Sequence, residues 1–211
     1  MKKILITPAI LLLLMSCGQA EHETTPTHID TPKKVDTQLK IVPPVTHYTA
    51  PDHSPMDMVY YPSDYPFLKM AGKSSGLPNI RVIYSRPQKE GRKIFGGLVK
   101  YDIPWRLGAN ESTEIEFFTP ATIQNKKIKP GRYILYCIPQ ETKWTFILNS
   151  NLYSWGLQQN RQLDQLQFEA PVEKNTLFIE YFTIAFEKKS DRSADMLFLW
   201  DEAKVKMTLD F

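Results

Sequence analysis

The chain has 211 residues, of which 42% are hydrophobic and 23% charged, an ordinary composition for a globular protein. Its formal net charge of +3 is too small to indicate nucleic acid as the main partner. Its two cysteines exclude a disulfide-rich scaffold and a multi-cysteine zinc site.

The N-terminus has the pattern of a secretion signal. Lys2 and Lys3 form a positive segment, and an apolar stretch of twelve residues follows over 4–15. At 1.5 Å per residue a helix of this length spans about 18 Å, well short of the roughly 30 Å hydrocarbon core of a membrane. We therefore predict a signal peptide over residues 1–16.

The apolar stretch ends in a motif that resembles the lipobox of bacterial lipoproteins, with Leu14 and Ser16 before Cys17. The alternative is an ordinary signal peptide beside a chance cysteine. We predict that Cys17 is lipidated and anchors the protein to a membrane, because several acyl chains on one residue hold stably. Gly18, in place of the Asp that retains such proteins at the inner membrane, predicts a location in the cell envelope at the outer membrane, on an undecided face.

Residues 17–55 are expected to form the lipidated end and a disordered, proline-rich tether. From residue 18 to 55 the chain has six prolines and one aromatic residue, Tyr48, which is too little apolar surface to form a core. The folded domain is then 56–211. All four histidines lie before this domain; they are His22, His28, His47 and His53. Their position excludes a Ser-His-Asp triad, a Cys-His pair and a His-ligated zinc centre inside the domain.

The domain reads as short strands separated by turn residues. We expect strands over 80–85, 113–118, 132–138, 143–149, 164–170, 175–187, 193–201 and 204–211. The last two are predicted to form a hairpin around 201–203, and no segment keeps an apolar helical period over three turns. The pattern predicts an all-β fold, an antiparallel β-sandwich or flattened barrel of about eight to ten short strands. Cys137 lies in an apolar strand, and we expect it to be a small buried core residue without a chemical role.

The most unusual segment runs from residue 84 to 111. It contains Tyr-Ser-Arg-Pro (84–87), Gly-Arg (91–92), Ile-Phe-Gly (94–96), Leu-Val (98–99), Trp-Arg (105–106) and Gly-Ala-Asn-Glu (108–111). With Lys-Pro-Gly-Arg-Tyr (129–133) and Trp-Gly (155–156), this string resembles the DUF2911 family, exported proteins found mostly in Bacteroidetes without an assigned function. The resemblance covers about residues 54–211, and residues 61–78 are an insert beyond the usual start. The family has no established catalytic residues, so the resemblance implies none here.

The same segment concentrates arginine, asparagine and aromatic residues, which suit a planar anion or a sugar acid. The proposed ligand-binding residues are Arg86, Trp105, Arg106, Asn110, Glu111 and Trp155. The alternative is a structural network in which Arg106 pairs with Glu111 and Arg86 caps loop carbonyls.

A His-and-Met cluster over 52–58 could bind Cu(I). The favoured interpretation is a junction between tether and domain whose methionines dock on the domain edge.

Two functions remain open from the sequence. The first is a non-enzymatic binding or scaffolding lipoprotein, with an anionic or glycan ligand and unknown protein partners. The second is a hydrolase of carbohydrate or envelope polymer that uses carboxylates, since the domain offers no histidine as general base. We expect neither a metal nor a cofactor.

Overall fold

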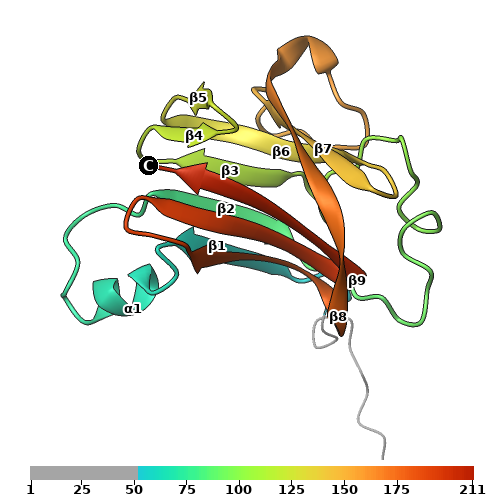
Figure 1. Ribbon diagram of the computed structural model, residues 1–211, viewed down its shortest axis with the longest axis horizontal. Helices are drawn as coiled ribbons and strands as arrows, with labels where there is room; N and C mark the ends of the chain where they lie inside the picture. The colour runs from blue at the N-terminus through green and yellow to red at the C-terminus, as the bar shows by residue number, and fades with distance from the viewer. Residues whose placement is uncertain (1–51) are drawn as a thin grey trace, which may run out of the picture. The chain divides into compact units, whose positions relative to one another are not determined.

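A computed structural model describes residues 52–211 (Figure 1). The predicted signal peptide, the lipidation site Cys17 and residues 18–51 of the tether lie outside the described residues. Within the described part, no helix has the length and apolar character needed to cross a membrane.

The fold is all-β and antiparallel, as predicted. The strands are β1 (Met56–Tyr61), β2 (Ile80–Ser85), β3 (Thr113–Phe117), β4 (Ala121–Ile123), β5 (Lys126–Ile128), β6 (Gly131–Pro139), β7 (Lys143–Asn149), β8 (Asp164–Lys188) and β9 (Ser193–Asp210). The only helical elements of 52–211 are α1 (Tyr65–Met70) and a 3₁₀ turn over Arg161–Leu163. Nine strands follow one another in the order β1-β2-β3-β6-β7-β8-β9-β4-β5, so the prediction of eight to ten strands is confirmed.

The long strand β8 turns the sheet back over itself. Its first part, up to Pro171, pairs with β7, and its second part, from Val172, pairs with β9. Figure 1 shows its ribbon changing direction between these two parts. Tyr84 of β2 then reaches across the interior, where its hydroxyl accepts a hydrogen bond from the Ile184 N–H of β8 at 3.0 Å. The two halves of the sheet therefore face one another around a shared core, which is consistent with the predicted sandwich or flattened barrel.

The prediction of separate strands over 164–170 and 175–187 was wrong, because these segments belong to the single strand β8. Pro171 directly follows the first of these segments and resembles the end of a strand. It lies instead where β8 changes partners, a position at which the missing N–H of proline costs no ladder bond.

The predicted hairpin around 201–203 was also wrong. β9 runs through it without reversal, and both sides of it pair with β8, as Leu199 does with Thr183 and Val205 with Val172. Asp201 has a φ of 55°, and the register shifts between Lys174 and Ile179 on β8. The turn-like residues thus form a bulge, which twists a strand pair without ending it.

Sequence analysis missed four short elements. β1 and α1 fall on the tether junction and on the segment over 61–78 that was read as an insert, while β4 and β5 form a hairpin whose turn residues, Gln124 and Asn125, both have positive φ. Three-residue strands such as β4 are too short to show alternation, which explains why no pattern indicated them.

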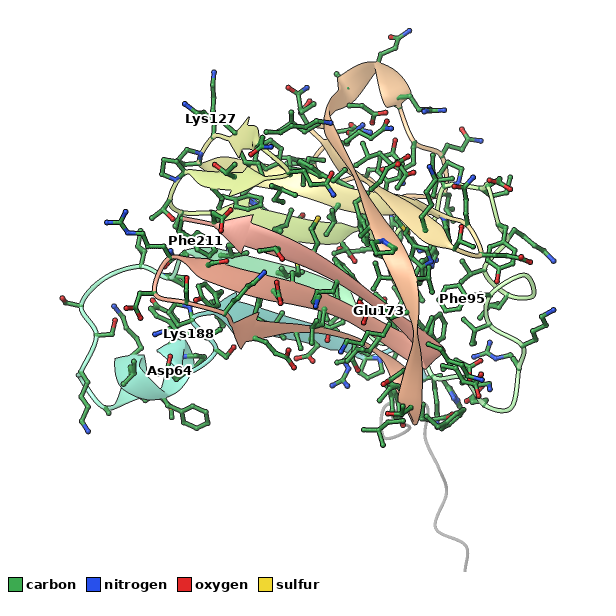
Figure 2. All side chains as sticks on the ribbon, in the orientation of Figure 1. Asp64, Phe95, Lys127, Glu173, Lys188 and Phe211 are labelled. Carbon is green, nitrogen blue, oxygen red and sulfur yellow. The ribbon has the colours of Figure 1, made fainter. Side chains whose placement is uncertain are left out.

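An aromatic cluster fills the end of the core under the long segment 86–112. Trp105, from that segment, packs against Trp144, Phe182 and Trp200, with ring centroids 5.0 to 5.8 Å apart. The main chain of Trp105 also exchanges two hydrogen bonds with Cys137, of 2.7 and 2.9 Å. Cys137 is fully buried, as predicted, and burial raises the pKa of its thiol. These contacts fix the segment 86–112 on the core, and Phe95, labelled in Figure 2, adds its ring to the same cluster.

Candidate functional site

A cavity of about 350 Å³ opens beside Trp105. The segment 86–112 contributes most of its wall, the β7–β8 connection adds Gly156 and Leu157, and Trp200 of β9 contributes from the core. Its lining is Ser54, Pro87, Arg92, Leu98, Val99, Pro104, Trp105, Arg106, Gly108, Ala109, Gly156, Leu157 and Trp200. No described residue in this lining carries a carboxylate, so its charged groups are all cationic.

Trp105 gives the cavity a rigid aromatic wall. Its ring stacks on Trp200 with centroids 5.8 Å apart and planes at 20°, and its Nε1–H donates to the Gly108 carbonyl at 3.1 Å. The indole is held on both its polar and its apolar sides, which favours a preformed surface for a ligand.

Arg106 is the cation with the fewest partners at this cavity. Its Nη1 donates one long hydrogen bond of 3.4 Å to the Trp155 carbonyl. Within residues 52–211 no carboxylate lies within 4.0 Å of the guanidinium, so the anticipated pair with Glu111 is not formed. Burial lowers the pKa of the Arg106 guanidinium, because the charged form loses water without gaining a counter-ion.

Arg92 also lines the cavity, but its guanidinium is already engaged. Its Nε donates to the Lys89 carbonyl at 2.9 Å, another N–H donates to the Gln88 carbonyl, and Glu90 lies 3.6 Å away. It therefore contributes positive charge to the rim and has fewer free donors than Arg106.

Arg86 does not line the cavity. Its three guanidinium nitrogens donate to the Phe182 carbonyl at 3.3 Å, to Asp57 at 3.2 Å and to the Thr183 hydroxyl at 3.0 Å. The structure thus separates Arg86, which connects β2 to β1 and β8, from Arg106 in the cavity wall.

The other proposed site residues lie around the cavity. Asn110, with φ of 57°, donates from its amide to Asp52 and to the Ser54 carbonyl, which holds Ser54 at the cavity edge. Glu111 and Trp155 line a neighbouring hollow of about 200 Å³. The six residues are therefore divided: Trp105 and Arg106 meet in the cavity, Glu111 and Trp155 meet next to it, Asn110 supports its edge, and Arg86 lies apart.

The backbone around the cavity is constrained to an unusual degree. Leu107 is fully buried yet has a φ of 55°, a conformation that costs free energy unless its surroundings enforce it. A Cβ on Gly108 would lie 2.8 Å from Ser85 Oγ, and this hydroxyl exchanges hydrogen bonds with the main chain of Ala109. Ser85 and Gly108 therefore shape the wall.

Sequence reasoning missed several cavity residues, including Ser54, Leu98, Leu157 and Trp200. Trp200 lies in an ordinary buried strand, and nothing in its neighbourhood in the sequence distinguishes it from core. For Leu157 a signal existed, since it directly follows the Trp155-Gly156 pair that carries part of the family pattern.

Two side chains of the cluster over 52–58 have partners within the protein. His53 Nδ1 lies 2.7 Å from Glu90 Oε1, and the Met58 sulfur accepts a hydrogen bond from the Tyr60 hydroxyl at 2.8 Å. Met56 and Met58 lie in the strand β1, half exposed. Across 52–211 no group of three or more His, Cys, Asp or Glu side chains is placed to hold a metal ion.

Comparison with family models found one match, to a family described as a protein of unknown function (DUF2911), over residues 68–209. This range includes the whole segment 86–112 and the β7–β8 connection, and so nearly all of the cavity lining. Comparisons with curated proteins and with solved structures found no match.

Proposed function

The chain belongs to the DUF2911 family, and from that premise we propose that it is a binding module whose cavity beside Trp105 takes an anionic ligand, with sugar acids as the leading class. The proposal places this module on a lipid anchor at Cys17, in the cell envelope at the outer membrane.

The observation that carries the proposal is the environment of Arg106. A partly buried guanidinium with one long hydrogen bond and no carboxylate partner within the described residues retains unused donors and uncompensated charge. A carboxylate or phosphate in the cavity would supply both the counter-charge and bidentate acceptors. The wall formed by Trp105 beside it offers a flat apolar surface for a ring.

The alternative, a carboxylate-dependent hydrolase, receives less support from the geometry. Such an enzyme requires two carboxyl groups that face one cleft at about 5–10 Å. The cavity lining supplies none. In the neighbouring hollow, Glu114 is already hydrogen-bonded to Arg132, which leaves Glu111 without a free carboxylate beside it.

A thermal-shift screen tests the binding function. Purified protein is heated with phosphates, sugar acids and neutral sugars, and we expect anions to raise the melting temperature because they bind the folded state; at 100 times Kd the gain is about 2.7 kcal/mol. Arg106→Gln should remove this response. Arg192→Gln, an exposed arginine on the β8–β9 turn, is the matched control and should keep it. No anion response in the unaltered protein would refute the binding function.

The anchor is tested separately. Replacement of Cys17 by Ser should release the protein from the membrane fraction, since no acyl chains can then be attached. Unchanged partition into membranes would contradict the lipoprotein assignment and leave the binding function untouched.

A further inference from the structure

A second hollow lies beside the cavity and contains a buried hydroxyl group without a partner. It is lined by Glu111, Ser112, Glu114, Tyr153, Ser154 and Trp155. Ser112 is only 4% exposed, and its Oγ has no hydrogen-bond partner among the described residues. Buried hydroxyls are nearly always bonded, so an orphaned one in the wall of a hollow indicates a missing polar group, such as a ligand hydroxyl.

Two aromatic rings stand exposed at this hollow. Tyr153 is 80% exposed and Trp155 is 62% exposed, although large aromatic side chains usually find cover. Tyr153 has a φ of 64°, and its ring lies 5.8 Å from the Arg132 guanidinium, which is itself bonded to Glu114. The rings are therefore presented from a constrained loop, as in binding surfaces that use rigid aromatic groups to limit entropy loss.

Gly156 lies between the hollow and the cavity. A Cβ at this position would lie 2.4 Å from Ser112 Oγ and 2.8 Å from Arg106 Cβ, so one residue without a side chain separates the orphaned hydroxyl from the cationic wall. The Trp155 carbonyl accepts the Arg106 hydrogen bond, while Trp155 also lines the hollow. The cavity, lined by Arg106, and the hollow, lined by Trp155, are thus neighbours on either side of Gly156.

The charges of the two compartments differ. The cavity carries Arg92 and Arg106 and no carboxylate in its described lining, whereas the hollow carries Glu111, together with a Glu114 that is paired with Arg132. An acidic group is favoured in the first compartment and disfavoured in the second. Hydroxyl donors and a flat apolar face suit the second, because they pair with Ser112 and stack on Trp155.

We infer that the ligand is an oligosaccharide in which an acidic sugar is joined to neutral sugars. The acidic sugar binds at Arg106 in the cavity, and a neutral sugar binds in the hollow between Ser112, Tyr153 and Trp155. This inference rests on the proposed function, since it assigns the second part of the same ligand.

Calorimetric titration of the full chain with three probes tests it. The probes are glucuronic acid, neutral xylotetraose, and a tetrasaccharide with one glucuronic acid linked to three xyloses. We expect the acidic tetrasaccharide to bind at least 10-fold tighter than either of the others, because only it occupies both compartments. Trp155→Ala should remove most of that gain, because it deletes the ring on which the neutral sugar stacks.

Two further variants and a fourth probe test the role of the hollow separately. Ser112→Ala removes an unpaired hydroxyl, so the protein should fold as well as before and yet bind the acidic tetrasaccharide several-fold more weakly. Leu177→Ala, a 68% exposed apolar side chain on β8, is the matched control for Trp155→Ala and should change no affinity. Tetragalacturonic acid, with a carboxylate on every sugar, should bind more weakly than the singly acidic tetrasaccharide because the Glu111 carboxylate repels it in the hollow.

The outcomes separate the two proposals. Glucuronic acid binding that depends on Arg106, without any gain for the acidic tetrasaccharide, would overturn the inference and leave the proposed function intact. A gain that survives Trp155→Ala and Ser112→Ala would also overturn it. If neither acidic probe binds, the inference is overturned, and the proposed function falls with it when no other anion raises the melting temperature. Xylotetraose that binds as tightly as the acidic tetrasaccharide also overturns the inference.

Discussion

Arg86 and Arg106 lie in one continuous family signature, and the fold uses them in opposite ways. The guanidinium of Arg86 has three hydrogen-bond partners, one of them the carboxylate of Asp57. Arg106 has one weak contact, to a carbonyl 3.4 Å away. The first arginine holds strands together, and the second leaves its donors free at a cavity.

The comparison shows that an arginine-rich signature need not be a single site. Tyr84 and Arg86 bond to β1 and β8, whereas residues 105–109 border the cavity and are supported by Ser85 and by the core beneath. A ligand function should therefore be assigned residue by residue, according to which donors the protein itself leaves unused.

The largest effect on stability is expected at Trp105. Trp105 and Trp155 differ in the same way as Arg86 and Arg106: the first is held by the protein, and the second is left with few contacts. Trp105→Ala should lower the free energy of unfolding by about 3–5 kcal/mol, because it empties the centre of the aromatic cluster under the cavity. Trp155→Ala should cost less than about 0.5 kcal/mol, since its ring is mostly exposed. Urea denaturation of both variants measures the difference, and equal losses would show that the exposed ring is also structural.

The second effect is a loss of stability in alkali, from Tyr84 beside Arg86. Burial raises the pKa of Tyr84 to about 12. Above pH 10 the unfolded chain ionises this phenol while the folded protein keeps it neutral, so its stabilisation is complete below pH 10 and is lost between pH 10 and 12. Two pH units correspond to about 3 kcal/mol.

The measurement is the free energy of unfolding against pH, for the unaltered protein and for Tyr84→Phe. The difference between the two curves should narrow by about 3 kcal/mol from pH 10 to 12. A constant difference would show that the Tyr84 hydroxyl ionises as readily in the folded protein as in the unfolded chain.

The third effect concerns the Arg86 network itself. Arg86→Ala should lower the free energy of unfolding by about 2 kcal/mol, because Asp57, the Phe182 carbonyl and Thr183 lose a donor while water replaces it only in part. The loss of stability is moderate because both charged side chains, Arg86 and Asp57, are about one-third exposed. A double-mutant cycle with Asp57→Asn isolates the ion pair, and additive losses would mean that the pair itself contributes nothing.

The smallest effect on stability is expected for Arg106→Ala. It removes one long hydrogen bond and a desolvated charge without a partner, so the free energy of unfolding should change by less than about 1 kcal/mol. The anion response in the thermal-shift assay should nevertheless disappear. A loss of about 3 kcal/mol or more before any ligand is added would identify Arg106 as structural and refute its role as a ligand site.

The class of fold could be predicted because the signals for it are local. Alternation along 113–117, the strand through Cys137 and the turn at 129–131 each depend on residues a few positions apart. Local signals failed where a residue type that is common at strand ends lies inside a continuous strand. Pro171 and Asp201 look like ends of strands, and only the pairing with β7, β8 and β9 shows that the chain continues through them.

Local sequence patterns therefore sufficed for the all-β class, the burial of Cys137 and membership of the family, but not for the individual strands, of which two pairs proved continuous and three were missed. Which residues of the signature form a site was decided by the tertiary structure alone. The Phe182 carbonyl that engages Arg86 lies 96 residues away along the chain, and the Trp155 carbonyl that touches Arg106 lies 49 residues away. The number of partners that each guanidinium has depends on such distant contacts, and no local pattern contains them.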